Sequence, residues 1–267
     1  MELIEGAKIA SVAAGKYLLR HLSELKKVHT KNSDFDFVTK FDKGAEEIFF
    51  TLLRGYFPDI PFLSEESGKT WDKENERFWV LDPLDGTSNY VRGMPIFTTS
   101  LALVEEGEPI LGVIYDPVRE ELFWAEKGKG AFLNNSSIHT SSHQTLKASV
   151  LSTSFSYELT LREKNAYYFQ YLYQYAQNIR NIGSSALSLA YAAVGRFDAY
   201  WTFSVSLWDI AAGALIVKEA GGTYSVLPPE EDFRLLTEYK TIGFLGANSY
   251  LFSDLLEILQ TDYKKLK

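Results

Sequence analysis

The sequence has no cysteine and only four histidines among its 267 residues. The absence of cysteine excludes disulfides, thiol nucleophiles and zinc sites with sulfur ligands. With so few imidazoles, we expect any bound metal to be held mainly by oxygen atoms. No run approaches the roughly 20 apolar residues that a membrane-spanning helix needs. Residues 1–27 lack the features of a secretory signal. The expected location is therefore the cytoplasm, with no membrane partner.

Positive charge is also scarce. The 27 Lys and Arg residues stand against 35 Asp and Glu residues, which gives a net charge of −8. Long-range attraction to a nucleic-acid backbone is therefore disfavoured, and we expect no nucleic-acid partner. An acidic protein that handles an anionic substrate usually needs a metal ion to offset the repulsion. The 46% hydrophobic fraction is ordinary for a globular chain, which can bury a sizeable core at this length.

Segments with helical spacing and short apolar runs follow one another along the chain. Past about Ala148 the pattern changes from consecutive strands to helices that alternate with strands. The pattern predicts an N-terminal α+β half, residues 1–140, which carries most candidate metal ligands. A C-terminal α/β half, residues 141–267, would complete a single compact unit. The expected helices cover residues 3–22, 42–53, 161–178, 184–194, 208–220 and 252–259, and the expected strands cover residues 60–63, 78–81, 97–104, 109–115, 121–125, 131–133, 198–203, 223–227 and 241–245.

Acidic residues gather at the ends of apolar runs. Glu65 and Glu66 follow one run, Asp82 and Asp85 follow another, and Asp209 opens a helix. Any one of them alone is typical of a helix cap or a turn. Together they would repel one another unless they are protonated or bind cations, and all-oxygen ligation suits Mg²⁺ or Mn²⁺. Two metal ions held by carboxylates are a recurrent solution for phosphate ester hydrolysis.

The segment Asp82–Thr87 has a spacing that favours a metal and phosphate site. Its two aspartates stand three residues apart and can turn toward one point, with Pro83 fixing the bend. The carbonyl oxygen of Leu84 can face the same point. Gly86 lets the backbone approach a ligand closely, and its N–H and that of Thr87 can bind phosphate oxygens.

Several segments resemble signatures of the inositol monophosphatase family, in its bacterial type, within the fructose-bisphosphatase/inositol monophosphatase superfamily. They stand in the family's order along the chain. Asp82–Asn89 resembles the DPxDGTxN signature, Leu207–Gly213 with Glu219–Gly222 resembles WDxAAG…EAGG, Asp36–Thr39 with Asp42 resembles DxVTxxD, Ser64–Ser67 resembles GEES with serine in place of the glycine, and Ile182–Ala186 also matches.

The resemblance implies a fold and an activity. The implied fold is the layered α-β-α-β-α sandwich of the sugar phosphatases, usually a homodimer. The implied reaction is Mg²⁺-dependent hydrolysis of a small phosphate monoester by water, most directly inositol monophosphate. Two or three ions per site are implied, with Mn²⁺ as a possible substitute, and inhibition by lithium is expected.

The resemblance also implies residue roles. Glu65, Asp82 and the Leu84 carbonyl would hold one ion, and Asp82, Asp85 and Asp209 a second. Thr87, hydrogen-bonded to Asp42, would activate the attacking water together with Glu65. Lys31 matches a family lysine near a weaker third metal. Asp209 would also help protonate the leaving group. The implied substrate contacts are Asp85, Gly86, Thr87, Ser88, Gly183, Ser184, Ser185 and Asp209.

Two residues leave the substrate open. Thr202 stands seven residues before Asp209, where the animal enzymes carry a glutamate that grips inositol hydroxyls; a shorter, uncharged side chain weakens that grip. Arg180 could contact a second phosphate of a larger substrate, or form a surface ion pair. NADP(H), fructose 1,6-bisphosphate, adenosine 3′,5′-bisphosphate and histidinol phosphate are therefore alternative substrates. A regulatory protein that binds a macromolecule is an alternative of another class.

Overall fold

The computed structural model describes residues 1–22, 40–70, 76–228 and 241–262. It contains two sheets, and the element bounds follow the chain. The helices are α1 Leu3–His21, α2 Lys40–Tyr56, α3 Thr87–Val91, α4 Leu159–Tyr173, α5 Ser185–Ala193, α6 Leu207–Glu219 and α7 Phe252–Gln260. The strands are β1 Phe62–Ser64, β2 Gly68–Lys69, β3 Arg77–Asp85, β4 Thr98–Glu105, β5 Glu108–Asp116, β6 Glu121–Glu126, β7 Ala131–Leu133, β8 Ser136–Ile138, β9 Val150–Thr153, β10 Asn178–Arg180, β11 Ala199–Val205, β12 Gly222–Leu227 and β13 Ile242–Asn248.

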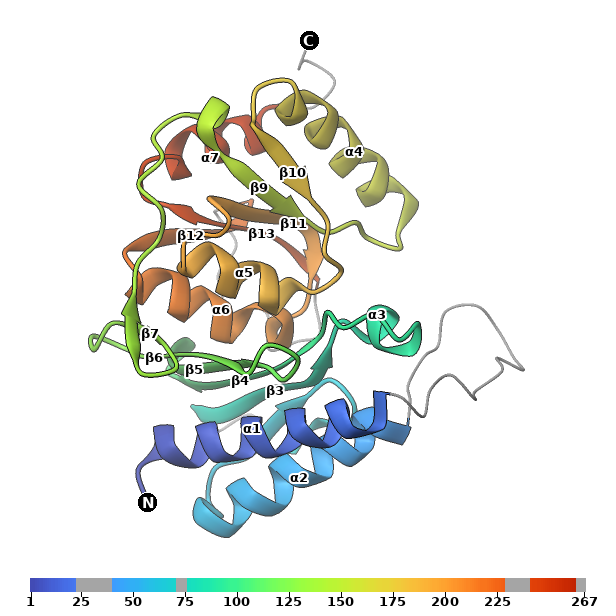
Figure 1. Ribbon diagram of the computed structural model, residues 1–267, viewed down its shortest axis with the longest axis vertical. Helices are drawn as coiled ribbons and strands as arrows, with labels where there is room; N and C mark the ends of the chain where they lie inside the picture. Colours follow the sequence, from blue (N-terminus) through green and yellow to red (C-terminus); the bar gives the residue numbers. More distant parts are fainter. Residues whose placement is uncertain (23–39, 71–75, 229–240, 263–267) are drawn as a thin grey trace.

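Helices and sheets alternate in layers, as Figure 1 shows. Helices α1 and α2 pack on one face of the eight-stranded sheet, and α5 and α6 lie between the two sheets. Helices α4 and α7 cover the outer face of the five-stranded sheet. The predicted α-β-α-β-α sandwich is therefore confirmed. None of the helices in the described ranges is long and apolar enough to cross a membrane.

The eight-stranded sheet has the order β2-β1-β3-β4-β5-β6-β7-β8. From β3 to β8 each strand pairs antiparallel with the next, so these six strands form a meander. Strand β1 runs parallel to β3 at the other end. Every residue of β3 after Arg77 is buried, as a continuous apolar run predicts for a strand that is covered on both faces.

Helix α6 joins the two sheets. It is apolar on nearly all sides because it is packed between two layers, and nine of its 13 residues are buried. On the first sheet, Gly112 of β5 allows this close approach. A Cβ atom at that position would lie 2.7 Å from the carbonyl oxygen of Ala212. The packing of α6 matters for function because its first turn carries Asp209.

Two of the predicted boundaries were wrong. The aromatic helix expected over residues 161–178 ends at Tyr173, and Asn178–Arg180 forms strand β10 beside β9 in the order β10-β9-β11-β13-β12. Parallel pairing of β10 with β9 outweighs the local helical pattern. The strand expected over residues 78–81 extends to Asp85, with an irregularity in its pairing to β4 between Asp82 and Asp85.

Candidate active site

The two aspartates of β3 lie at the end of the strand, where its pairing to β4 is irregular. Pro83 lacks an N–H and cannot continue a regular ladder, so the irregularity occurs at the residue where the sequence predicts a bend. One carboxylate oxygen from each of Asp82, Asp85 and Asp209 lies within 4.8 Å of the others. Three of the residues proposed as metal ligands are thus brought together from two layers, the eight-stranded sheet and helix α6.

Asp209 lies in the first turn of α6, where the helix dipole favours a negative charge. Its Oδ2 accepts a hydrogen bond of 2.7 Å from the backbone N–H of Ser206. This contact is half of a capping box, and it fixes the orientation of the carboxylate.

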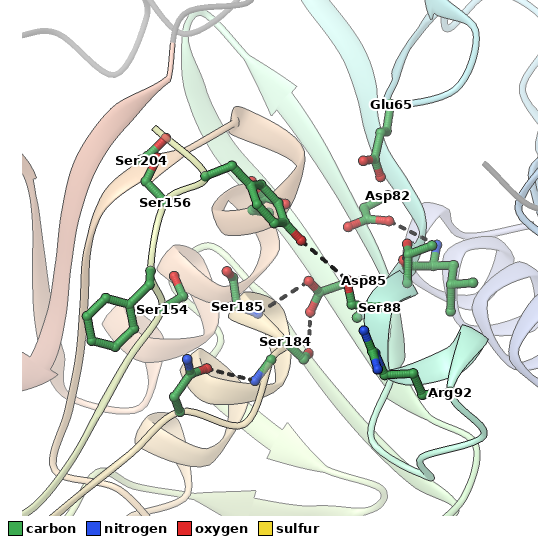
Figure 2. A pocket seen from close by; sticks show the side chains of 18 of the residues that line it. Glu65, Asp82, Asp85, Ser88, Arg92, Ser154, Ser156, Ser184, Ser185 and Ser204 are labelled. Atoms are coloured by element: carbon green, nitrogen blue, oxygen red, sulfur yellow. Dashed lines mark hydrogen bonds between the residues drawn. The ribbon is translucent and has the colours of Figure 1, made fainter. Parts of the chain in front are cut away.

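Asp85 is held by the start of α5. Its carboxylate accepts a very short hydrogen bond from the hydroxyl of Ser184, and bonds of 3.2 and 2.9 Å from the backbone N–H groups of Ser185 and Ala186. Figure 2 shows the contacts of Ser184 and Ser185 with Asp85. Ser184 was expected to touch the substrate, and the structure shows its hydroxyl donating to Asp85.

Leu84, between the two aspartates, and Thr87, which follows them, also form hydrogen bonds. The N–H of Leu84 donates to Asp82 Oδ1 at 2.9 Å, and the hydroxyl of Thr87 donates to the carbonyl oxygen of Leu84, also at 2.9 Å. The resemblance predicted Asp42 as the partner of Thr87. Asp42 is buried on α2, and its negative charge acts on the acidic cluster.

The acidic residues perturb one another. Burial raises the pKa of Glu65 to about 7; a hydrogen bond with Asp82 lowers it in part, and the charges of Glu66 and Asp85 add to the rise. By surface area Glu65 is an exposed residue, but it lies in a concave site that removes part of its hydration. The pKa values of Asp82 and Asp209 are also raised, first by burial and then by neighbouring carboxylates. Such a cluster fits a site for divalent cations.

Glu46, on α2, holds the turn that carries Glu65. Its Oε1 accepts a very short hydrogen bond from the hydroxyl of Ser64 and a 3.1 Å bond from the N–H of Ser67. Its Oε2 accepts from the hydroxyl of Ser67 at 2.5 Å. Sequence reasoning missed this residue. The available signal was a second acid one turn after Asp42, on the buried face of an amphipathic helix.

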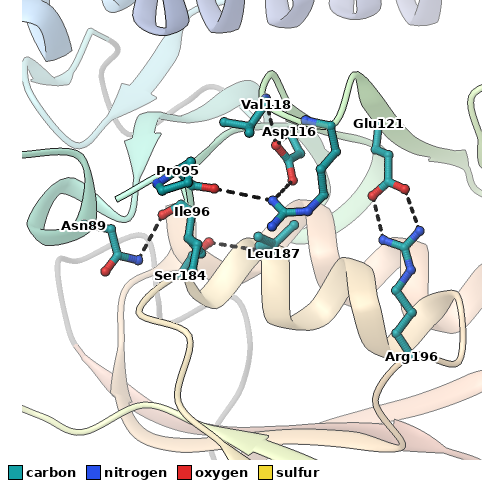
Figure 3. A network of polar contacts seen from close by, with 10 residues as sticks. Asn89, Pro95, Ile96, Asp116, Val118, Glu121, Ser184, Leu187 and Arg196 are labelled. Carbon is teal, nitrogen blue, oxygen red and sulfur yellow. Dashed lines mark hydrogen bonds and ion pairs between the residues drawn. The ribbon is translucent and has the colours of Figure 1, made fainter. Parts of the chain in front are cut away.

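Asn89 joins the two glycine turns of the site. Its amide Nδ2 donates to the carbonyl oxygens of Ile96 at 2.9 Å and Ile182 at 2.8 Å; Figure 3 shows the contact with Ile96. Gly183 has a φ of +75°, and a Cβ there would lie 2.8 Å from this amide nitrogen. Gly86 has a φ of +95°, which side chains disfavour. The asparagine of the first signature thus fixes the backbone around the turn at Gly86, which was predicted to bind phosphate.

Glu219, in the second signature, binds the backbone of the turn between β6 and β7. Its two carboxylate oxygens accept hydrogen bonds of 2.8 and 2.9 Å from the backbone N–H groups of Gly128 and Gly130. It therefore ties the turn between β6 and β7 to the end of α6, at a place away from the acidic cluster. Figure 3 shows a second tie between the halves, in which Arg196 forms an ion pair with Glu121 at 2.5 Å.

A cavity of about 790 Å³ opens over the acidic cluster. Figure 2 shows that both halves of the chain line it. The predicted residues around it, apart from Asp42, come from two groups of elements. Glu65, Asp82, Leu84, Asp85, Gly86, Thr87 and Ser88 come from the first half, and Gly183, Ser184, Ser185 and Asp209 come from the second.

Two predicted substrate contacts lie elsewhere. Arg180 is exposed on β10, and its guanidinium donates to the carbonyl oxygen of Ile179 at 3.3 Å. Thr202 is fully buried on β11, and Ser154, which does line the cavity, donates to its hydroxyl at 3.1 Å. Thr202 therefore lies one layer behind the cavity wall. Lys31 and Asp36–Thr39 fall outside the described residues.

Comparison with known proteins agrees with this geometry. The sequence model of the Inositol monophosphatase family matches residues 1–260. The chain belongs to this family. An inositol-1-monophosphatase of Synechocystis is 38% identical over 83% of the chain and 78% of its own length. The Nus factor SuhB of Xylella fastidiosa is 44% identical over 80% of the chain and 78% of its own length.

A solved structure of an inositol monophosphatase family member supports the same assignment. The inositol monophosphatase from Anabaena superimposes with a TM-score of 0.83 at 36% identity, and covers 96% of this chain and 94% of its own. Membership of the inositol monophosphatase family supports a phosphatase activity and a metal-dependent site. The triad of Asp82, Asp85 and Asp209 is suited to hold a metal.

The raised pKa values predict how the metal-free protein responds to pH. Glu65 has a pKa of 4.5 in the unfolded chain and about 7 in the folded protein, so the folded state binds its proton more tightly. The resulting contribution to the free energy of unfolding is fully present below pH 4.5. That contribution is lost as the pH rises through 7. We therefore expect the melting temperature in EDTA to fall between pH 5.5 and 8.5, and added Mg²⁺ to raise it most at the alkaline end.

Differential scanning fluorimetry across this pH range, with EDTA or with Mg²⁺, measures the effect. Asp82→Asn should flatten the pH dependence in EDTA, because it removes one buried carboxylate of the cluster. Asp59→Asn, an exposed acid in the turn after α2, is the matched control. Equal pH dependence in the wild type and the Asp82→Asn variant would contradict the prediction.

Proposed function

We propose that the protein is a cytoplasmic, Mg²⁺-dependent phosphatase that hydrolyses small phosphate monoesters, with inositol monophosphate as the first candidate. The observation that carries this proposal is the position of Asp82, Asp85 and Asp209 within 4.8 Å of one another beneath a cavity with two glycine turns. Two or three ions per site, Mn²⁺ as a substitute and inhibition by lithium belong to the same proposal.

The residues present fit such a metal site. All candidate donors are carboxylate or carbonyl oxygens, which Mg²⁺ and Mn²⁺ prefer. Glu65, Asp82 and the carbonyl of Leu84 would hold one ion, and Asp82, Asp85 and Asp209 another. When bound, such ions lower the pKa of water and stabilise developing negative charge on the leaving oxygen.

The chain's own groups supply the remaining parts of the reaction. The backbone N–H groups of Gly86 and Thr87 would hold phosphate oxygens, since Gly86 keeps the backbone open to a ligand. Glu65 would accept a proton from the attacking water. Thr87 would orient that water, and Asp209 would direct a proton to the leaving oxygen.

The wall of the cavity favours a hydroxylated leaving group. Ser154, Ser156, Ser185 and Ser204 line it. Tyr200 lies behind them, and its hydroxyl bonds to both Ser154 and Ser185 at 2.8 Å. Uncharged hydroxyls can both donate to and accept from a polyol. Thr202 stands where the animal enzymes carry the glutamate that binds inositol hydroxyls. The other phosphate esters named above therefore remain candidate substrates.

Phosphate release from a substrate panel tests the proposal. The panel holds inositol 1-phosphate, fructose 1,6-bisphosphate, NADP, adenosine 3′,5′-bisphosphate and histidinol phosphate, each with Mg²⁺, with EDTA and with Mg²⁺ plus lithium. We expect turnover that requires Mg²⁺ and is inhibited by lithium, and kcat/KM ratios then name the substrate. No release from any compound, by folded protein that binds Mg²⁺, would reject these substrates.

A second candidate function is the binding of a macromolecule, in a homodimer or a larger assembly. It is favoured by the 44% identity to a protein named Nus factor SuhB. The net charge of −8 disfavours direct nucleic-acid contact, so a protein partner is the more suitable form of this candidate. Affinity purification with wild-type and Asp85→Asn protein separates the two functions. A stoichiometric partner retained by the variant would support the binding role.

A further inference from the structure

We propose that the outer end of the cavity binds a second anionic group of the substrate through Arg92. This inference rests on the phosphatase function proposed above and specifies its substrate class: phosphate esters whose leaving group carries a second phosphate. The position of Arg92 among the lining residues, and the acidic character of the rest of the cavity, carry the inference.

The cavity is strongly acidic apart from this residue. Of the described residues that line it, Arg92 is the single basic one, whereas six are acidic: Glu65, Glu66, Asp82, Asp85, Glu158 and Asp209. An anionic group placed away from the metal ligands would be repelled by this field unless a cation faces it. Arg92 is exposed and makes no ion pair with any described residue.

The backbone that carries Arg92 is well fixed. The N–H of Arg92 donates to the carbonyl oxygen of Asn89 at 3.1 Å, and that of Met94 donates to the same oxygen at 2.9 Å. Gly93 has a φ of +70° and closes the turn after α3. Because Asn89 also holds the two glycine turns, the backbone of Arg92 is fixed relative to those turns.

The opposite wall completes the outer end of the cavity. Figure 2 shows Arg92 and Ser88 on the side opposite to Ser154 and Ser156. The hydroxyls of Ser88 and Tyr157 lie 3.3 Å apart, and connect α3 to the segment after β9. Hydroxyl groups can contact the body of a sugar, and the planar guanidinium can bind a phosphate with two parallel hydrogen bonds. A neutral polyol would not need this cation.

The test compares two substrates that differ by one phosphate. Fructose 1-phosphate and fructose 1,6-bisphosphate share the reacting ester, and release of the C1 phosphate is measured with Mg²⁺. For Arg92→Ala we expect the ratio of kcat/KM, bisphosphate over monophosphate, to fall about tenfold or more, mainly through KM. Arg92→Lys should recover part of the ratio, because a point charge replaces the planar fork.

Arg180→Ala is the matched control, since it removes the same charge from an exposed site outside the cavity. It should change the ratio little. Equal losses on both substrates with Arg92→Ala, or an unchanged ratio, would overturn the second site while leaving the phosphatase proposal standing. If the wild type hydrolyses neither sugar, calorimetric titration of both sugars into wild-type and Arg92→Ala protein decides: only a selective loss of bisphosphate affinity supports the inference.

Discussion

Replacing Asp85 with asparagine is expected to lower kcat/KM for the best substrate by more than about a thousandfold, while the fold is retained. Asp85 lies within 4.8 Å of both other aspartates of the triad, so its charge acts on any ion bound there. The substitution removes that charge. It also directs an amide group toward the hydroxyl of Ser184 and the N–H of Ala186, which need an acceptor.

Steady-state kinetics, calorimetric Mg²⁺ titration and circular dichroism together measure this expectation. The buried carboxylate is costly without a metal, so the thermal stability of the metal-free variant should not fall far below that of the wild type. Asp59→Asn serves as the control, because it removes one exposed acid far from the cluster. Near-wild-type turnover of the Asp85→Asn protein would reject Asp85 as a metal ligand.

Replacing Glu46 with alanine is expected to weaken Mg²⁺ binding by about 10- to 100-fold, the range found when groups that orient metal ligands are removed. Glu46 accepts three hydrogen bonds from Ser64 and Ser67, which flank Glu65. Without these bonds the turn can move, and the carboxylate of Glu65 loses its fixed position. Activity should recover in large part at high Mg²⁺, because the metal ligands themselves are unchanged.

Glu46→Gln separates orientation from charge. Its amide oxygen can still accept from Ser64 and from the N–H of Ser67, so Mg²⁺ affinity should stay closer to that of the wild type. Glu47→Ala, an exposed neighbour on α2, is the control for the helix. Mg²⁺ affinity measured by calorimetry without substrate is the deciding value. Unchanged affinity in Glu46→Ala, with a simple drop in melting temperature, would assign Glu46 to stability alone.

The sequence predicts the acidic triad well because its information is local. Asp82 and Asp85 lie on one strand end, and Asp209 lies in a helix turn, so spacing and short motifs suffice to propose them. The same reasoning chose Arg180 because it stands three residues before Gly183. Strand β10, which no local pattern predicted, instead places Arg180 at the surface. Arg92 went unnoticed because its role depends on a wall formed by residues 154–158.

Contacts between distant elements are the part that sequence alone does not reveal. Glu46 meets Ser64 and Ser67 only after α2 packs along the first sheet, and Thr202 becomes buried because Ser154 covers it. Likewise, β9 is short and partly polar, so its pairing with β10 and β11 gives it the strand conformation. The layered architecture was predictable because the periodicity of most elements is strong.

The sharing of Asp85 between the two halves has a consequence for protein synthesis. The ribosome completes β3 about a hundred residues before α5 supplies Ser184 and Ala186, and still earlier than Asp209 in α6. During that interval the nascent chain has some acids of the cluster but not the groups that orient them. The ion proposed to bind Asp82, Asp85 and Asp209 together therefore needs α6, and prematurely terminated chains that lack α6 should be inert as well as less stable.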